Sequence, residues 1–390
     1  MKKLFATCIL VNIAVLAAAG PEEVQIYSYL YNGAATGPEQ LGILQSMIER
    51  KVSGAGSFYV SALRRLISGY PNIRDSAELS AANEQAALLA AQIGVERFSS
   101  AAPYLWFLAD RFPDSQVRAE ALMSLGKIQA VNYLPQIINI LNKLNVEPPA
   151  DRAGGERIAF AAIIALEKYA NSSGYLPVFF ASVGWYSDRV KKQAANSLAL
   201  ISKNPEPFLA EIISGPDYSY AVKYTALQTA AASAMPESQK AAIALAALPG
   251  SWGASSKEAA SSTLVNMRKL SLEMIGRYGT PDAAVYPLLE RCYTSGVDIN
   301  EKKAAIATLP HLPGGEAAGL LIKFFTALDA KQKNKTLTAD DNALAREIIT
   351  ALGDTKQPAA IPVLNSIQKS GWDSAVKKMA RAALKQIPKK

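Results

Sequence analysis

A short helical string recurs along this chain, and the recurrence restricts the possible folds more than any other feature. Residues 114–128 read DSQVRAEALMSLGKI, residues 266–276 read NMRKLSLEMIG, and residues 343–353 read ALAREIITALG. Each copy opens with an apolar anchor, which is followed by a small residue four positions later and an apolar residue eight positions later. This spacing lies on one face of a helix, and the small central residue lets a second helix approach closely.

The same register is found eight times. The anchors with their following residues are Val117/Ala121/Leu125, Ile158/Ala162/Leu166, Val190/Ala194/Leu198, Val222/Ala226/Ala230, Met267/Ser271/Ile275, Glu301/Ala305/Leu309, Leu344/Ile348/Leu352 and Val376/Ala380/Leu384. The copy that begins at Glu301 is the least regular, because a carboxylate stands where the other copies have an apolar anchor.

A second helix is predicted after the first helix of each copy. The pairs Leu134-Pro135, Leu176-Pro177 and Ile361-Pro362 begin three of these second helices, and proline is well tolerated in a first turn. Neither helix of such a unit can bury its apolar face alone, so successive pairs must stack. We therefore expect an all-α solenoid of about 8–10 antiparallel helix pairs.

The copies follow the pattern Asp-x-x-Val-Arg-x-x-Ala-x-x-x-Leu-Gly, with Leu-Pro after it. The matching residues are Asp114, Val117, Arg118, Ala121, Leu125 and Gly126 in the first clear copy, and Leu344, Arg346 (displaced by one position), Leu352 and Gly353 in the seventh. This pattern resembles HEAT repeats, in particular the short HEAT-like type also found in phycocyanobilin lyases. The resemblance covers about residues 75–388 and implies a right-handed α-α superhelix. It implies a scaffold or adaptor rather than lyase activity, because a fold does not fix a function.

Four regions are expected along the chain. Residues 1–19 are predicted to be a signal peptide, and residues 20–37 an extended segment whose aromatic run VQIYSYLYNG is the only strand candidate. Residues 38–113 are predicted to form atypical N-terminal capping helices, and residues 114–390 the HEAT-like repeats.

The N-terminal region predicts export to the periplasm or the extracellular space. Lys2 and Lys3 precede an apolar run over residues 4–16, and three alanines at 17–19 form a small-residue cleavage site. The alternative is an uncleaved anchor helix, although the run is shorter than the ~20 residues of a comfortable membrane span. No other segment is long and apolar enough to span a membrane.

Cleavage would leave Cys292 as the only cysteine, so we expect no intramolecular disulfide. The formal net charge of +8 is mild for 390 residues. It favours an acidic envelope surface as a neighbour and gives no reason to expect nucleic acid.

Three gaps between anchors are longer than the compact unit. The extra residues are VEPPADRAGG (146–155), PGSWGASSKE (249–258) and DAKQKNKTLTA (329–339), and each joins a second helix to the next first helix. In a solenoid such junctions share one edge, where insertions often mark a binding side; the alternative is that they are tolerated surface loops. The candidate binding residues here are Trp252, which has nothing local to bury against, and Lys257, Lys331, Lys333 and Lys335.

Basic residues recur directly after the anchors. They are Arg118, Lys191, Lys223, Arg268, Lys302 and Lys377. One interpretation is a positive stripe that binds an acidic peptide, polymer or lipid headgroup. The other is a structural ladder, in which these side chains pair with turn carboxylates such as Asp114 and Asp188.

Catalytic and metal-binding patterns are not found in the sequence. His311 is the only histidine, so there is no zinc constellation and no Ser-His-Asp or Cys-His pair. Ser-x-x-Lys occurs three times without its accompanying motifs, which is close to chance. The strings TADDNA (338–343) and GGEAAG (314–319) predict helix starts. We expect no catalytic residue, no metal and no cofactor.

These observations favour a non-enzymatic scaffold or adaptor in the bacterial cell envelope, with another envelope protein as its partner. Two alternatives stay open. One is a binding module for an acidic envelope polymer or lipid headgroup, and the other is a non-catalytic subunit of an envelope enzyme complex.

Overall fold

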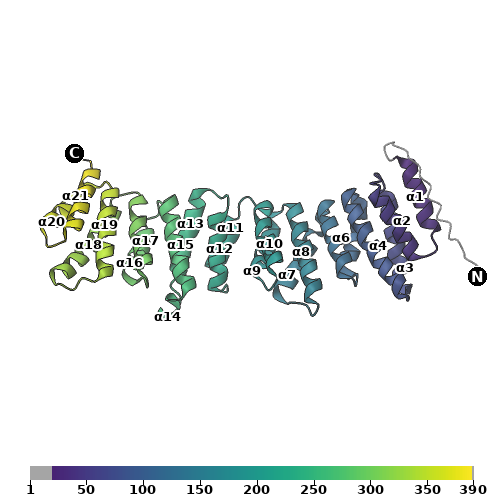
Figure 1. Ribbon diagram of the computed structural model, residues 1–390, viewed down its shortest axis with the longest axis horizontal. Helices are drawn as coiled ribbons and strands as arrows, with labels where there is room; N and C mark the ends of the chain where they lie inside the picture. The colour runs from purple at the N-terminus through teal and green to yellow at the C-terminus, as the bar shows by residue number, and fades with distance from the viewer. Residues whose placement is uncertain (1–19, 389–390) are drawn as a thin grey trace, which may run out of the picture. The chain divides into compact units, whose positions relative to one another are not determined.

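The structure is a computed structural model that describes residues 20–388, and these residues contain 21 α-helices and no strand (Figure 1). The all-α prediction is therefore confirmed. The predicted signal peptide lies outside the described residues. The chain divides into two compact units, Met1–Ile201 and Ser202–Lys390.

Unit 1 is a stack of five helix pairs. Its helices are α1 (Pro21–Gly33), α2 (Gly37–Glu49), α3 (Gly56–Gly69), α4 (Ser76–Val95), α5 (Ala102–Arg111), α6 (Ser115–Lys127), α7 (Leu134–Val146), α8 (Arg152–Tyr169), α9 (Tyr175–Val183) and α10 (Asp188–Ile201). The even-numbered helices pack one on the next and form a row, and each odd-numbered helix packs on the even-numbered helix that follows it. The predicted capping helices thus stack in the same way as the repeats.

Unit 2 repeats this arrangement with five more pairs. Its helices are α11 (Glu206–Ser214), α12 (Tyr220–Ala232), α13 (Glu237–Gly250), α14 (Ser256–Ala259), α15 (Ser262–Tyr278), α16 (Val285–Ser295), α17 (Ile299–Thr308), α18 (Glu316–Lys333), α19 (Ala339–Asp354), α20 (Ile361–Lys369) and α21 (Ser374–Gln386). The row is α12, α15, α17, α19 and α21, and α11, α13, α16, α18 and α20 pack on these helices in turn. Each unit is therefore solenoid-like, while the handedness of the superhelix stays a prediction.

The N-terminal segment corrects one prediction. Residues 20–37 were expected to be extended, but Pro21–Gly33 forms α1. Tyr27 and Tyr31 are four residues apart and both buried, so the helical spacing decides the structure rather than the alternation of aromatic and polar residues. The hydroxyl of Tyr31 donates a hydrogen bond to Gln85 Oε1 at 2.6 Å, which ties α1 to α4.

The predicted repeat register is the register of the core. Val117, Ala121 and Leu125 are completely buried, and the corresponding residues of the other copies are buried with the exceptions of Val222 and Leu384, which are half-buried. At the α6–α8 contact, a Cβ added to Gly126 would lie 2.7 Å from the Cα of Ala165. The two helices can therefore approach this closely only because residue 126 has no side chain.

Short polar side chains fix where the helices of each row begin. The carboxylate of Asp114 accepts hydrogen bonds from the backbone N–H groups at the start of α6, and Asp298 and Asp373 do the same for α17 and α21. Thr338 and Asp341 form a capping box at the start of α19, as the sequence predicts.

Candidate functional site

The sequence predicts that Trp252 is a binding residue of the 249–258 insertion, but the structure buries its side chain. It is only 5% exposed, and two guanidinium groups lie over its ring, with the Cζ of Arg268 at 4.3 Å and the Cζ of Arg291 at 4.4 Å from the ring centroid. The small residues around it in the sequence offer no local cover, so the loop folds back onto α15 and α16. Trp252 is therefore a cation–π anchor of its own insertion, and its indole is not an exposed binding group.

The burial of Arg268 shows that the predicted basic stripe is wrong at this residue. Its side chain is completely buried and forms an ion pair with the equally buried Glu301, with Nε 2.6 Å from Oε1 and Nη2 3.1 Å from Oε2. The Nη1 atom donates to the carbonyl oxygen of Ser251 at 2.5 Å, and Nη2 donates to that of Ala259 at 2.8 Å. Arg268 therefore fastens both ends of the 249–258 insertion. The pair also explains why a carboxylate stands at the anchor position of the sixth copy.

The other members of the stripe do not form a series of exposed cations. Lys223 is 8% exposed, and Lys191, Lys302 and Lys377 are half-buried. Arg118 is also half-buried and donates its Nε–H to the carbonyl oxygen of Ala109 at 2.9 Å. The ladder interpretation holds only at some repeats. Asp114 caps its own helix and Arg118 bonds a carbonyl oxygen, whereas Arg268 pairs with Glu301 of the next repeat, and Arg346 lies 3.6 Å from the turn carboxylate of Asp373.

Two of the insertion lysines are held in ion pairs within the chain. The Nζ of Lys331 lies 2.9 Å from Asp341, and the Nζ of Lys333 lies 2.8 Å from Asp329. Helix α18 continues through Lys333, so the first part of this predicted loop is helical. Lys335 is exposed beside a cavity of about 260 Å³, and Lys257 is exposed on α14.

The predicted edge can be compared only within unit 2. The 249–258 and 329–339 insertions both join a second helix to the next first helix of this unit, so its connectivity places them at the same end of the helix pairs. The third insertion, 146–155, belongs to unit 1.

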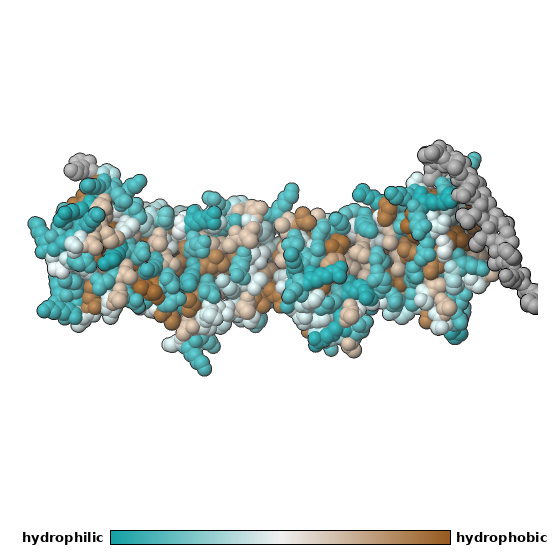
Figure 2. All heavy atoms as spheres, viewed as in Figure 1, coloured by the Kyte–Doolittle hydropathy of each residue, from teal (hydrophilic) through white to brown (hydrophobic). Residues whose placement is uncertain are grey.

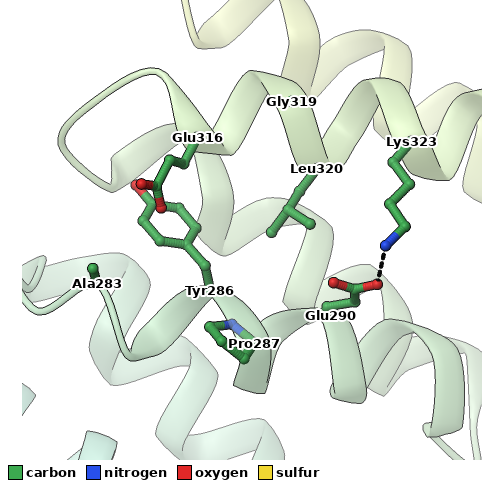
Figure 3. Close-up of a pocket in the computed structure, with 8 residues that line it drawn as sticks. All are labelled: Ala283, Tyr286, Pro287, Glu290, Glu316, Gly319, Leu320 and Lys323. Carbon is green, nitrogen blue, oxygen red and sulfur yellow. Dashed lines mark hydrogen bonds and ion pairs between the residues drawn. The ribbon is translucent and has the colours of Figure 1, made fainter.

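A groove lies between α16 and α18, which the sequence did not predict (Figure 3). Its volume is about 460 Å³, within the range of about 300–1,000 Å³ that is usual for ligand pockets. The lining residues are Ala283, Tyr286, Pro287, Glu290, Glu316, Gly319, Leu320 and Lys323. We call this cavity the α16–α18 groove.

The middle of the α16–α18 groove is apolar. Leu320 points from α18 toward Pro287 on α16 (Figure 3), and Gly319 beside it leaves the wall without a side chain. A Cβ added to Gly319 would have no atom within 4 Å. The groove can therefore accept an apolar group of a ligand without any rearrangement of α18.

The two ends of the α16–α18 groove carry charge. At one end the Nζ of Lys323 lies 2.5 Å from a carboxylate oxygen of Glu290 (Figure 3). At the other end Glu316, the first residue of α18, is exposed and has no hydrogen bond or ion pair within the described part of the chain.

Tyr286 fixes the position of the loop that leads into α18 and Glu316. Its hydroxyl donates a hydrogen bond to the carbonyl oxygen of Pro313 at 2.7 Å. Burial, and then the charge of Glu316, raise the pKa of Tyr286, so the phenol stays protonated and remains a donor. The start of α18, where Glu316 lies, is thus tied to α16.

The groove holds neither a nucleophile with an adjacent base nor a set of metal ligands. Residues 20–388 contain no group of three or more His, Cys, Asp or Glu side chains that could hold a metal ion. They also contain no helix that combines the length and hydropathy of a membrane span. The arrangement is suited to binding an apolar group beside a cation.

Sequence reasoning missed the groove because its two walls are about thirty residues apart and meet only in the folded unit. The only local signal was GGEAAG at 314–319, which correctly predicts the start of α18 near Glu316. A comparison with protein-family models finds no match, and a comparison with curated proteins finds none either. The resemblance to HEAT repeats therefore stays a prediction.

Proposed function

We propose that this protein is a non-enzymatic scaffold that binds another protein of the bacterial cell envelope. The observation that carries the proposal is the α16–α18 groove, an open cavity with an apolar middle and an unpaired carboxylate at one end. Such a site offers shape, apolar area and one charge, which are the requirements of recognition rather than of catalysis.

The packing of unit 2 supports a role in rigid display. Helices α15 and α17 are joined by the buried Arg268–Glu301 pair, and the Thr308 hydroxyl of α17 donates to the Leu272 carbonyl oxygen of α15 at 3.0 Å. A surface that is ordered before binding loses less conformational entropy when its partner arrives. On the face drawn in Figure 2, hydrophobic residues are interspersed with hydrophilic ones, so a few local anchors suit this surface better than one large apolar patch.

The rival proposals have less support. Binding of an acidic polymer or lipid headgroup depended on a continuous basic stripe, and the burial of Arg268 and Lys223 interrupts it. A non-catalytic subunit of an enzyme complex is a special case of the scaffold, and it would be distinguished by the identity of the partner. Export is part of our proposal and depends on the signal-like residues 1–19.

Site-specific photo-crosslinking in the bacterial envelope tests the scaffold proposal. The photoreactive residue p-benzoylphenylalanine would replace one of three exposed residues at a time: Ala283 at the groove, Lys257 on α14, or Ala382 on α21. We expect a discrete protein adduct at one or more positions, identified by mass spectrometry. Adducts with lipid or glycan alone, or no adduct at any position, would contradict the scaffold proposal.

The same samples test export. Export predicts that the mature N-terminus lies near Gly20 and that the protein resists protease added to intact cells only while the envelope is closed. An N-terminus at Met1 in a cytoplasmic fraction would rule out this part of the proposal.

A further inference from the structure

We propose that the α16–α18 groove binds a partner segment in which an aliphatic side chain lies next to a lysine or arginine. The aliphatic group occupies the space beside Gly319 and Leu320, and the cation pairs with Glu316. This inference rests on the proposed scaffold function and names the chemistry that its partner must present.

The charges of the groove select a cation. Its lining contains two carboxylates and one ammonium group, and the ammonium group of Lys323 is already paired with Glu290. Glu316 therefore carries the unbalanced charge, and Tyr286 holds the loop that immediately precedes it. A phosphate or carboxylate ligand would be repelled, which excludes an acidic polymer or anionic lipid headgroup as the occupant of this groove.

The apolar middle of the groove favours an aliphatic side chain next to this cation in the ligand. Leu320 is half-buried, and no atom lies within 4 Å of the position that a Cβ of residue 319 would take. An aliphatic side chain placed there covers Leu320 and Pro287 and removes their apolar surface from water. Glu316 and Gly319 are three residues apart on α18 and so lie on the same side of this helix. A ligand whose backbone turns between its aliphatic residue and the adjacent cation can therefore reach both.

Short peptides and saturation-transfer difference NMR test this chemistry directly with the full-length protein. The probe is acetyl-Ser-Gly-Leu-Arg-Gly-Ser-amide, and the comparison peptides replace Arg by Glu or Leu by Ser. We expect saturation transfer to the leucine methyl groups of the probe and little transfer to either comparison peptide. Equal transfer to all three peptides, or none to the probe, would overturn the inference.

Two variants test whether the peptide binds in the α16–α18 groove. Gly319→Leu fills the groove from a helical position with no neighbouring atom within 4 Å, so we expect loss of saturation transfer in a folded protein. Glu316→Gln should weaken binding about two- to fivefold, as for one exposed ion pair. Unchanged transfer with Gly319→Leu would show that the peptide binds elsewhere.

Gly42→Leu is the matched control. Gly42 also lies within a helix, α2, is exposed and has no atom within 4 Å of an added Cβ. We expect both leucine variants to unfold at or slightly above the wild-type temperature and only Gly319→Leu to lose the peptide. A loss of binding in both would assign the effect to something other than the groove.

The outcomes separate this inference from the scaffold proposal. A protein adduct from Lys257 or Ala382 together with failure of the peptide experiment leaves the scaffold and rejects the groove as its site. If light scattering instead shows that Gly319→Leu converts a dimer to a monomer, the occupant is a second copy of this chain and the inference is wrong.

Discussion

Two arginines occupy the same position of the repeat, one in each unit, and they have different surroundings. Arg118 follows the anchor Val117 in α6 and is half-buried, whereas Arg268 follows the anchor Met267 in α15 and is completely buried. Both donate to the carbonyl oxygen of the residue nine positions earlier, at 2.9 Å and 2.8 Å. The repeat therefore supplies the same backbone contact in both units.

The different surroundings of the two arginines correspond to a different anchor residue in the next helix of the row. In unit 1 that anchor is Ile158 in α8, an apolar residue that is itself buried. In unit 2 it is Glu301 in α17, whose carboxylate draws the guanidinium group of Arg268 into the core. One position in the neighbouring helix thus determines whether a repeat arginine stays at the edge or becomes a buried ion pair.

The largest expected effect comes from removing the carboxylate of the buried pair. Glu301→Leu leaves the guanidinium group of Arg268 buried and unpaired, so we expect the free energy of unfolding to fall by about 3–5 kcal/mol. Urea denaturation followed by circular dichroism measures the loss. A change below 1 kcal/mol would show that water reaches Arg268.

The double variant Arg268→Met with Glu301→Leu is the control for this prediction. It removes both charges and places apolar side chains at both positions, so we expect a stability close to that of the wild type. A double variant as unstable as the single variant would mean that the 249–258 insertion, which Arg268 fastens, contributes most of the stability.

The second prediction concerns the close approach of α6 and α8 in unit 1. Gly126→Ala places a methyl group 2.7 Å from the Cα of Ala165, and a backbone atom cannot move aside as a side chain can. We expect a loss of about 1–3 kcal/mol from the displacement of the helices.

Gly42→Ala provides the comparison for this loss. Its added methyl group meets no atom, so it should stabilise α2 by about 0.5–1 kcal/mol. The same denaturation experiment measures both variants. If Gly126→Ala were neutral, the α6–α8 contact would not depend on the missing side chain.

The sequence predicted those features that depend on local spacing. The positions of Val117, Ala121 and Leu125 in the core follow from a period of four residues, which can be read without a structure. The burial of Trp252 could not be predicted in this way, because Arg291, which covers one face of the ring, is 39 residues away. Glu301 was recognised as irregular, but its partner was not.

The candidate site was less predictable than the fold for the same reason. The α16–α18 groove is lined by residues of two helices, among them Gly319 and Pro287, and neither residue is unusual in its own segment. The insertion lysines were visible in the sequence, but the carboxylates that neutralise Lys331 and Lys333 became apparent only in the folded unit.

A third prediction concerns a variant of unit 1 that receives a carboxylate at the anchor position, as unit 2 has in Glu301. Ile158→Glu places a carboxylate next to Arg118 in the position that Glu301 has next to Arg268. The variant should be destabilised, but less in the wild type than in an Arg118→Met background, with a coupling free energy of about 1–2 kcal/mol. A double-mutant cycle measured by urea denaturation gives this value. A coupling of zero would show that the surroundings of Arg118 cannot rearrange.

The smallest predicted effect is the pH dependence of stability that the Cys292 thiol causes. This thiol is buried near the Arg268–Glu301 ion pair. Burial, and then the charge of Glu301, raise the pKa of this thiol from 9.0 to about 12. Below pH 9 the thiol is protonated in both the folded and the unfolded chain. Between pH 9 and 12 only the unfolded chain loses this proton, so the folded state loses stability as the pH rises, by about 1 kcal/mol at pH 10.

The difference in slope between the wild type and Cys292→Ala isolates this effect, because buried tyrosines such as Tyr293 contribute equally to both proteins. Urea denaturation at pH 8, 9 and 10 should show a shallower decline for Cys292→Ala, and parallel declines would contradict the raised pKa. The same series in the Arg268→Met, Glu301→Leu background separates the two causes. Since burial is the larger cause, most of the slope should persist without the ion pair. A slope that disappears with the pair would mean that the charge of Glu301, rather than the packing of α16, keeps the thiol protonated.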